Sequence, residues 1–378
     1  MERPRKASQK PGELFKRLRN VDPEAFWDDD DAVELELLAR ARKRASVIRI
    51  EPGASKFDFQ SASEDRLKFL FRFDREGLLN LANFVFGELV GNRKLYTKYD
   101  DAFLPIEGLC IALRVLVSGG RLGDLCETFG RSISGLSRIA TEVIDLLAQK
   151  AKAVLGVFDM QRLSSQAFVE AIESVVGFET RVAFILDCKL WETAEFGAAR
   201  GLLYNGDKKR DGFKTVNIVA PDGNCYFMAG PYIGSQHDSS CATDAEIPAK
   251  TWRTFREFNV RCYADSAFSR SDALWTNFKR NHMSAEVAQA QAPIQSARGE
   301  IEHFFGAVIL NFRLLSNRLE MKIGSRPLYD YVVCAVFLTN CLNCHKCADG
   351  GNQISKRFGL SPPSLVEYLN YCENLLRQ

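Results

Sequence analysis

A change in hydrophobic period near residue 181 constrains the fold of this chain more than any other feature. Before it, apolar residues recur at the three- and four-residue spacing of helices, whereas RVAFILD (181–187) is a short apolar run. Val182, Phe184 and Ile185 are of the β-branched and aromatic types that suit a packed strand. Because the run leads straight into an acid, we expect Asp187 to end this strand at the rim of a cleft.

Three further strands are predicted after this one, and helices follow them. The strands are GFKTVNIVA (212–220), NCYFMAG (224–230) and NVRCYAD (259–265). Pro221-Asp222-Gly223, between the second and the third strand, has the chemistry of a hairpin turn. Helical spacing returns over residues 285–318 and in LYDYVVCAVFLTNCLNC. Strands followed by helices predict one α/β domain, which we assign to residues 176–345.

The preceding residues, 61–175, have a helical pattern throughout. Within them, residues 122–147 read as a short helix, a turn at Gly130 and a longer helix. This is the order of a helix-turn-helix, in which Ser134 and Arg138 would lie exposed at the start of the helix that enters DNA. A plain pair of antiparallel helices has the same pattern, so both interpretations stay open.

Composition bounds the class of protein. With 378 residues, 46% of them hydrophobic, the chain can bury a large core. Its net charge is only +2, so a DNA-binding surface must be a local concentration of Lys and Arg. The N-terminus has no apolar signal region, and no apolar run approaches the roughly 18 residues of a membrane span. Eleven scattered cysteines favour a reducing compartment, and we expect the protein in the nucleus or cytoplasm.

The two ends of the chain carry weaker signals. Residues 1–60 form a charged segment whose first 20 residues are basic. They are typical of a nuclear localisation signal or of an arm that contacts phosphates, and equally of a solvated, partly disordered tail. Residues 346–378 are predicted as a C-terminal tail with one short helix.

Three acids form the candidate catalytic and metal-binding set: Asp187, Asp265 and Glu302. Two of them follow apolar strands, and the third lies on a helix in SARGEIEHFFG. Converging carboxylates need a cation, and an all-oxygen set suits Mg²⁺ or Mn²⁺. Two such ions would activate water and stabilise the leaving oxygen of a phosphodiester. Glu300 lies on the same helix and is the alternative to Glu302, and a chain with 48 acids can also present such a trio by chance.

Polar residues between the strands extend this candidate site. The basic loop YNGDKKRDGFK (204–214) contributes Lys208, Lys209, Arg210 and Lys214 as candidate DNA contacts. His237 and Asp238, in GSQHDSS, are candidates to support the metal ligands. Both segments also fit ordinary solvated loops.

From about residue 67 to residue 369, the chain resembles the PIF/Harbinger-type transposase nucleases. The motifs that carry the resemblance include RFDREGLLNL, DLCETFGRSISGLSRI, YNGDKKRDGFK, YADSAF, SARGEIEHFFG and GNQISKRFGLSPPSLVEYL, in the family's order. This family is a branch of the DDE superfamily. Its fold is RNase H-like, a mixed sheet flanked by helices, and here it would follow an N-terminal helical domain that contains the helix-turn-helix.

The resemblance implies a metal-dependent DNA endonuclease or transposase that acts at transposon ends. The family's acids match Asp187 in ILDCK, Asp265 in YADSAF and Glu302 in RGEIEHFFG, which selects Glu302 over Glu300. The chain departs from the family where Cys188 and Lys189 replace a small Gly-Thr pair. The Cys188 side chain would crowd a metal ion, and the Lys189 ammonium would partly neutralise the site.

Three functions are consistent with these patterns. The first is the divalent-metal nuclease or transposase, with DNA as partner and with a homo-oligomer or a separate DNA-binding protein as further expected partners. The second is a domesticated transposase that binds DNA or a protein without cutting. The third is a metal-dependent phosphoesterase with another substrate, against which the helix-turn-helix pattern argues.

The segment CLNCHKC (341–347) spells a haem-attachment motif and contains four potential zinc ligands. Cys341 and Cys344 lie one helical turn apart, and Cys334 lies on an earlier turn of the same predicted helix. We therefore expect these cysteines to pack as small apolar groups.

Overall fold

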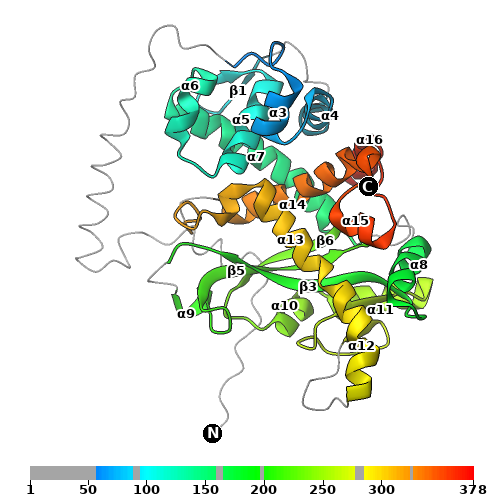
Figure 1. Ribbon diagram of the computed structural model, residues 1–378. Helices are drawn as coiled ribbons and strands as arrows, with labels where there is room; N and C mark the ends of the chain where they lie inside the picture. Colours follow the sequence, from blue (N-terminus) through cyan, green and yellow to red (C-terminus); the bar gives the residue numbers. More distant parts are fainter. Residues whose placement is uncertain (1–56, 88–93, 159–164, 196–199, 277–284, 324–326) are drawn as a thin grey trace.

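The computed structural model of the protein describes residues 57–87, 94–158, 165–195, 200–276, 285–323 and 327–378. The charged N-terminal segment lies outside these residues, apart from its last four. A layer of helices lies above a β-sheet, and further helices cover both faces of the sheet (Figure 1). None of the helices in the described ranges is long and apolar enough to span a bilayer.

The upper layer contains the predicted short helix, glycine turn and longer helix of residues 122–147. Its elements are α3 (Glu64–Phe71), α4 (Arg75–Phe86), β1 (Leu95–Tyr96), β2 (Ala102–Phe103), α5 (Pro105–Ser118), η3 (Leu122–Leu125), α6 (Cys126–Phe129) and α7 (Ile133–Leu155). Gly130 ends α6 with a φ of 59°, a conformation that glycine adopts without strain. Ser132 then caps α7, because its side chain accepts a hydrogen bond from the backbone N–H of Gly135 at 3.1 Å.

The sheet is mixed, as expected for a nuclease of the DDE type. Its strands are β3 (Val182–Glu192), β4 (Tyr204–Asn205), β5 (Arg210–Val219), β6 (Cys225–Ile233), β7 (Arg261–Ala264) and β8 (Leu274–Thr276). The strand order is β4-β5-β3-β7-β8, and β6 pairs with β5. β3 is antiparallel to β5 and parallel to β7, which is parallel to β8. The β5–β6 hairpin turns at the predicted Pro221-Asp222-Gly223, where Gly223 has a φ of 82°.

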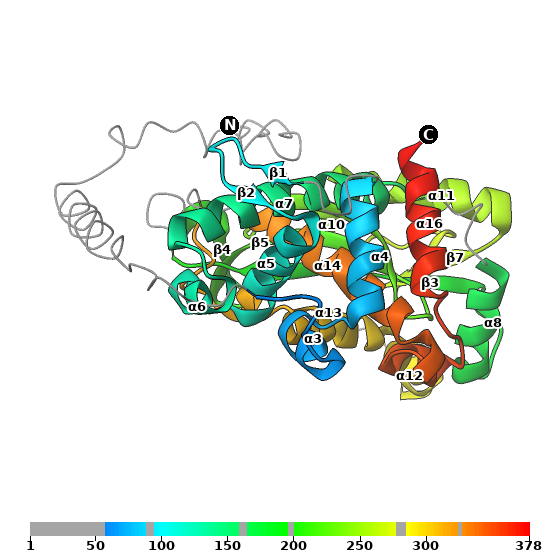
Figure 2. The same cartoon turned by 90° about the horizontal axis from the view of Figure 1, so that it is seen from above.

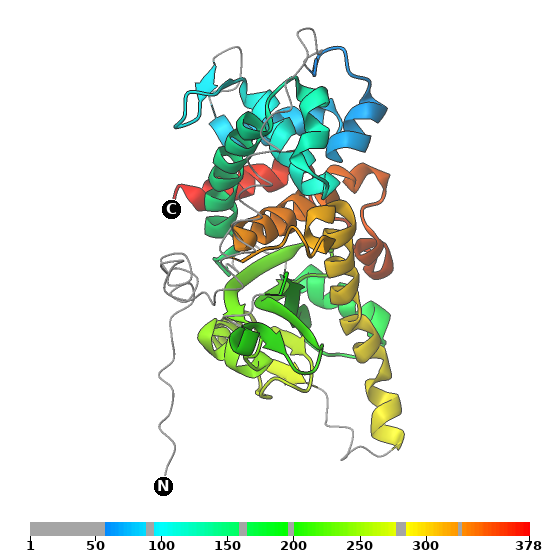
Figure 3. The ribbon, with the colours of Figure 1, turned by 90° about the vertical axis from the view of Figure 1, so that its left-hand side faces the viewer.

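Two apolar clusters cover the two faces of the sheet. Ile185 and Tyr263 belong to the cluster shared with the upper helices, whereas Leu186 and Cys262 belong to a second cluster on the opposite face. Helices α12 (Ala285–Arg298) and α13 (Glu300–Asn311) run along the first face. Helices α10 (Asp238–Asp244) and α11 (Ile247–Phe258) lie on the other side of the sheet (Figure 3). Helix α8 (Ser165–Val176) contributes residues to both clusters.

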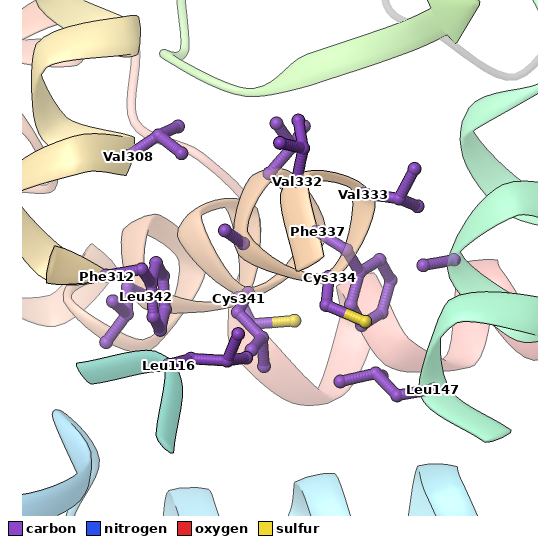
Figure 4. Packing of buried hydrophobic residues seen from close by; sticks show 14 of the residues in the cluster. Leu116, Leu147, Val308, Phe312, Val332, Val333, Cys334, Phe337, Cys341 and Leu342 are labelled. Carbon is purple, nitrogen blue, oxygen red and sulfur yellow. The ribbon is translucent and has the colours of Figure 1, made fainter. Parts of the chain in front are cut away.

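Helix α14 (Leu328–His345) is the centre of the molecule. Every side chain from Tyr331 to Cys344 is buried, so no face of this helix meets solvent. Its residues pack against α5, α7 and α13, and Figure 4 shows Phe337 and Cys341 among Leu116, Leu147 and Phe312. Cys334, Cys341 and Cys344 are buried free thiols within this core, which confirms the expectation that they pack as small apolar groups.

The C-terminal residues contain two helices where the sequence predicted one. They are α15 (Gln353–Phe358) and α16 (Leu365–Leu376). Helix α16 lies beside α4 (Figure 2), and its Tyr368 hydroxyl accepts a hydrogen bond from Asn340 Nδ2 of α14 at 2.9 Å. This segment is therefore packed onto the core and does not form a tail.

Candidate active site

Asp187 lies in the middle of β3, so the expectation that it ends its strand is wrong. The antiparallel pairing with β5 continues to Glu192 opposite Gly212. The parallel pairing with β7 does stop there, because its last pair is Leu186 with Ala264. Asp187 and Asp265 are the next residues on these two neighbouring strands. The register therefore brings both carboxylates to the same level of the sheet.

The alternation of β3 puts Asp187, Lys189 and Trp191 on one face. Trp191 packs edge-on against Phe305 of α13, with ring centroids 6.2 Å apart, so this face is the one that α12 and α13 cover. Cys188 points to the other face, where its sulfur lies 3.8 Å from the backbone oxygen of Asp238. The expected crowding of a metal ion by Cys188 is therefore wrong.

Arg298, the last residue of α12, lies between two of the three acids. Its Nη1 is 4.0 Å from Asp187 Oδ2, and its Nη2 is 3.9 Å from Glu302 Oε1. The Glu302 side chain is 67% exposed, whereas that of Asp187 is 19% exposed. No role was predicted for Arg298, although its four-residue spacing from Glu302 on a helix indicates that the two side chains can meet.

Glu300 has a different environment from Glu302. Its carboxylate is buried, pairs with Arg357 of α15 and lies at hydrogen-bond distance, 2.8 Å, from His303 Nδ1. Arg357 also donates to the side chain and the backbone oxygen of Ser296. Glu300 therefore joins α13 to α15, and Glu302 is the acid of this helix that lies across Arg298 from Asp187.

Burial raises the pKa of Asp187 from 3.8 to about 6. The positive charge of Arg298 and the N–H of Cys188 oppose this shift, while the negative charges of Asp238 and Asp265 add to it. Burial lowers the pKa of Lys189. The nearby carboxylates of Asp187 and Glu302 oppose this shift. Its ammonium group is 5.5 Å from the ring centre of Phe305. The site thus combines three carboxylates with two cations of the chain itself.

The donor atoms at this site are oxygens, as a hard divalent cation requires. Asn217, the cross-strand partner of Asp187, is buried, and its side-chain oxygen has no hydrogen-bond partner among the described residues. That oxygen and the carboxylates fit Mg²⁺ or Mn²⁺ in chemical type. However, among the described residues no three His, Cys, Asp or Glu side chains already converge as a metal-binding group. Arg298 separates Asp187 from Glu302, whose exposed side chain has room to turn.

The basic loop divides into exposed and buried members. Lys208 and Lys209 are exposed, and Arg210 is half exposed and lies 3.6 Å from Glu192. Lys214 is buried instead, and its Nζ donates to Asp238 Oδ1 and to the backbone oxygen of Gln236, both at 2.7 Å. The prediction that Lys214 contacts DNA is therefore corrected, because a buried ammonium bound to a carboxylate is not available to a phosphate.

His237 and Asp238, which were predicted to support the metal ligands, have different surroundings. Asp238 lies close enough to Asp187 to affect its pKa, and Lys214 holds its carboxylate. The His237 side chain is exposed, at the position that precedes α10. Of the two, only Asp238 is held in place by a partner near the acids.

On α7, Ser134 is exposed but Arg138 is not a free cation. Two of its guanidinium nitrogens bond both carboxylate oxygens of Asp101, from the loop after β1, with Nη2 at 2.8 Å from Oδ1. Its guanidinium also lies 5.6 Å from the ring centre of Tyr99. The expectation of an exposed Arg138 is corrected, since this pair joins α7 to the β1–β2 hairpin.

One family model matches the part of the chain that contains the candidate site. Residues 186–340 match the family model of the DDE superfamily endonucleases. The match begins one residue before Asp187 and includes Asp265, Arg298 and Glu302. No curated protein and no solved structure matches the chain. The matched segment is thus similar to a DDE superfamily nuclease, a class that acts on DNA.

The contrast between the two glutamates gives a first prediction. Glu300→Gln leaves Arg357 without its buried partner, so the free energy of unfolding should fall by about 2–3 kcal/mol. Glu302→Gln, on the same helix but exposed, should change it by less than about 0.5 kcal/mol. Urea denaturation of both variants measures the difference. Equal stability losses in the two would contradict the assignment of Glu300 to the structural pair.

The buried Asp187 gives a pH-dependent prediction. A carboxyl whose pKa rises from 3.8 to about 6 on folding binds its proton more tightly in the native state. Stability should therefore fall as pH rises through this window and stay low above it. Asp187→Asn removes the charge, so in EDTA its stability gain over the parent should grow by about 1–2 kcal/mol between roughly pH 4.5 and pH 7.5.

Urea denaturation at the two pH values tests this expectation. Replacing Asp349, an exposed acid far along the chain, by Asn is the matched control and should not alter the pH dependence. A constant difference between Asp187→Asn and the parent at both pH values would show that Asp187 does not titrate in this window.

Proposed function

We propose that this protein is a divalent-metal-dependent DNA endonuclease of the transposase type, with a PIF/Harbinger-like catalytic domain of RNase H-like fold. The observation that carries the proposal is the shared level of Asp187 and Asp265 at the end of the β3–β7 pairing, inside the segment matched by the DDE endonuclease model. Glu302 lies across Arg298 from Asp187.

In this proposal, Asp187, Asp265 and Glu302 hold Mg²⁺ or Mn²⁺, and Asn217 offers a further oxygen beside Asp187. Such ions, when bound, activate water for attack on a phosphodiester and stabilise the departing 3′ oxygen. The protein's own contribution is positional. Burial of Asp187 disfavours an unpaired charge, so the carboxylates are arranged to favour a cation. Asp265 Oδ1 accepts the N–H of Ser266 at 2.6 Å, which orients that carboxylate.

DNA would reach this site along surfaces that carry exposed positive or polar groups. Lys208 and Lys209 lie on the loop that joins β4 to β5, and Arg210 is the first residue of β5. Lys208 is near enough to Lys189 to lower the pKa of Lys189. Exposed lysines of this kind suit phosphate contacts. Ser134, exposed in the first turn of α7, supports the proposal that this helix approaches a groove of the duplex.

A second candidate function is DNA binding without cleavage by a domesticated transposase. Two observations favour it. Arg298 and Lys189 already supply positive charge to the carboxylates, and the described residues present no preformed metal group. In this alternative the internal cations substitute for the metal ions, and the domain keeps only its DNA-binding role. The two candidates differ in their response to added metal.

Cleavage measurements on single variants test the enzyme directly. Asp187→Asn, Asp265→Asn and Glu302→Gln should each lower Mg²⁺- or Mn²⁺-dependent cleavage of supercoiled DNA by at least about 100-fold, because each removes a proposed ligand. Asp349→Asn, an exposed acid outside the site, is the control and should cleave like the parent. A parent that binds DNA but cleaves none with either metal would favour the domesticated protein. Full activity in one variant would remove that residue from the set.

Lys189 should oppose metal binding, because its ammonium lies near both Asp187 and Glu302. We expect Lys189→Thr, which restores a small residue, to lower the midpoint of a Mn²⁺ titration by roughly 5-fold or more. The midpoint is measured by thermal stabilisation, which does not require catalysis. Lys346→Thr removes an exposed lysine away from the site and should leave the midpoint unchanged. An unchanged midpoint in Lys189→Thr would show that this lysine does not compete with the metal.

A further inference from the structure

A groove of aromatic and cationic residues lies at the β8 edge of the sheet, outside the proposed active site. Its volume is about 480 Å³, and the described residues that line it are Trp252, Arg261, Arg270, Ser271, Asp272 and Trp275. Trp252 belongs to α11, and Trp275 belongs to β8, the last strand of the sheet order. The groove thus combines two tryptophans with two arginines. The sheet and its helices do not need this combination in order to fold.

The aromatic groups are held in a fixed arrangement. Trp275 packs edge-on against Tyr263 of β7, with ring centroids 6.2 Å apart. Trp252 lies 5.9 Å from Phe255 on the same helix, at a tilt of 32°. The Trp252 side chain is nevertheless 46% exposed, so one large aromatic surface faces solvent at the groove. An exposed, supported indole is a surface on which a flat ring can stack.

The cations are also oriented. The Arg261 guanidinium stacks on the Phe255 ring at 5.5 Å from its centre, and its Nε donates to the backbone oxygen of Asp272 at 2.8 Å. No carboxylate of the described residues forms an ion pair with Arg261. Arg256, exposed one helical turn after Trp252, adds positive charge to the same face of α11. Asp272 is the one acid among the six lining residues.

We propose that this groove binds a single-stranded segment of DNA, with an unpaired base stacked on Trp252 and the adjoining phosphates on Arg256 and Arg261. Stacking on an aromatic ring together with a cationic track is how single strands are bound without base-specific contacts. A duplex cannot stack a base on Trp252, because its bases are already stacked on one another. An acidic peptide would use the arginines and leave the exposed indole without a partner.

The position of the groove connects it to the proposed site. Arg261 begins β7, and Asp265 follows the end of the same strand, so the two lie about 13 Å apart at the usual rise per residue. A strand that leaves the scissile phosphate could therefore reach the groove within a few nucleotides. The inference rests on the proposed function, since it identifies an unpaired strand next to the cleavage point as part of the substrate.

Binding of the full chain to a fluorescent oligothymidylate of about 20 nucleotides, in EDTA, tests the groove without cleavage. Trp252→Ala should weaken binding roughly 5- to 150-fold, the effect of losing one stacked base, while Trp252→Phe should keep most of the affinity. Arg261→Gln should also weaken binding. Affinity for a duplex of the same length should stay unchanged in Trp252→Ala.

Two matched controls make the test specific. Arg253→Gln removes a charge from the residue after Trp252, which does not line the groove, and Phe69→Ala removes an aromatic ring that is 70% exposed on α3. Both should bind like the parent. Unchanged oligothymidylate affinity in Trp252→Ala would overturn the inference. So would equal losses in Arg253→Gln and Arg261→Gln, or competition by polyglutamate as strong as that by unlabelled oligothymidylate.

The outcomes also separate this inference from the proposed function. If Trp252→Ala binds single strands normally while Asp187→Asn abolishes cleavage, the groove assignment fails and the nuclease stands. If Trp252 governs single-strand binding but the parent cleaves no DNA with either metal, the groove stands and the nuclease fails.

Discussion

Two carboxylates on neighbouring parallel strands repel one another, and the rest of the site depends on how this protein compensates for that repulsion. Asp187 and Asp265 are brought level by the register of β3 and β7, which the apolar residues on both faces of the sheet maintain. Burial makes the charge on Asp187 costly, as its raised pKa indicates. The guanidinium of Arg298 is the nearest opposite charge, and it reaches Asp187 and Glu302 alike. The carboxylates are therefore stable here only beside a cation, whether it comes from the chain or from solution.

The position of Arg298 depends in turn on residues far away in the sequence. Arg298 and Glu302 lie on either side of Gly299, where α12 ends and α13 begins. Next to this junction, Arg357 of α15 holds Glu300 and the two polar groups of Ser296. Helix α15 contacts α13 and α8, and α16 is fixed on α14, whose residues from Tyr331 to Cys344 are all buried. The C-terminal helices thus contribute to the geometry of the site although none of their side chains faces it.

Much of this arrangement could be predicted from sequence because it depends on local pattern. The apolar run of residues 182–186 and the Pro221-Asp222-Gly223 turn are properties of adjacent residues. What could not be predicted depends on partners that are distant in the chain. The end of β3 is decided by β5, which continues to pair after β7 has stopped. Similarly, Lys214 and Arg138 look like free cations until Asp238 and Asp101 are found beside them.

The same distinction explains why Glu300 and Glu302 were hard to separate by residue type alone. Both are acids in the first turn of α13, and a helix of that pattern has no local reason to bury one and expose the other. Tertiary contacts make the difference, because Arg357 and His303 satisfy Glu300, whereas Glu302 keeps an exposed side chain. An exposed carboxylate can move at little cost, which a buried and paired one cannot. In the proposed nuclease, that freedom would let the Glu302 carboxylate turn from the guanidinium of Arg298 toward the two aspartates and hold a metal ion together with them.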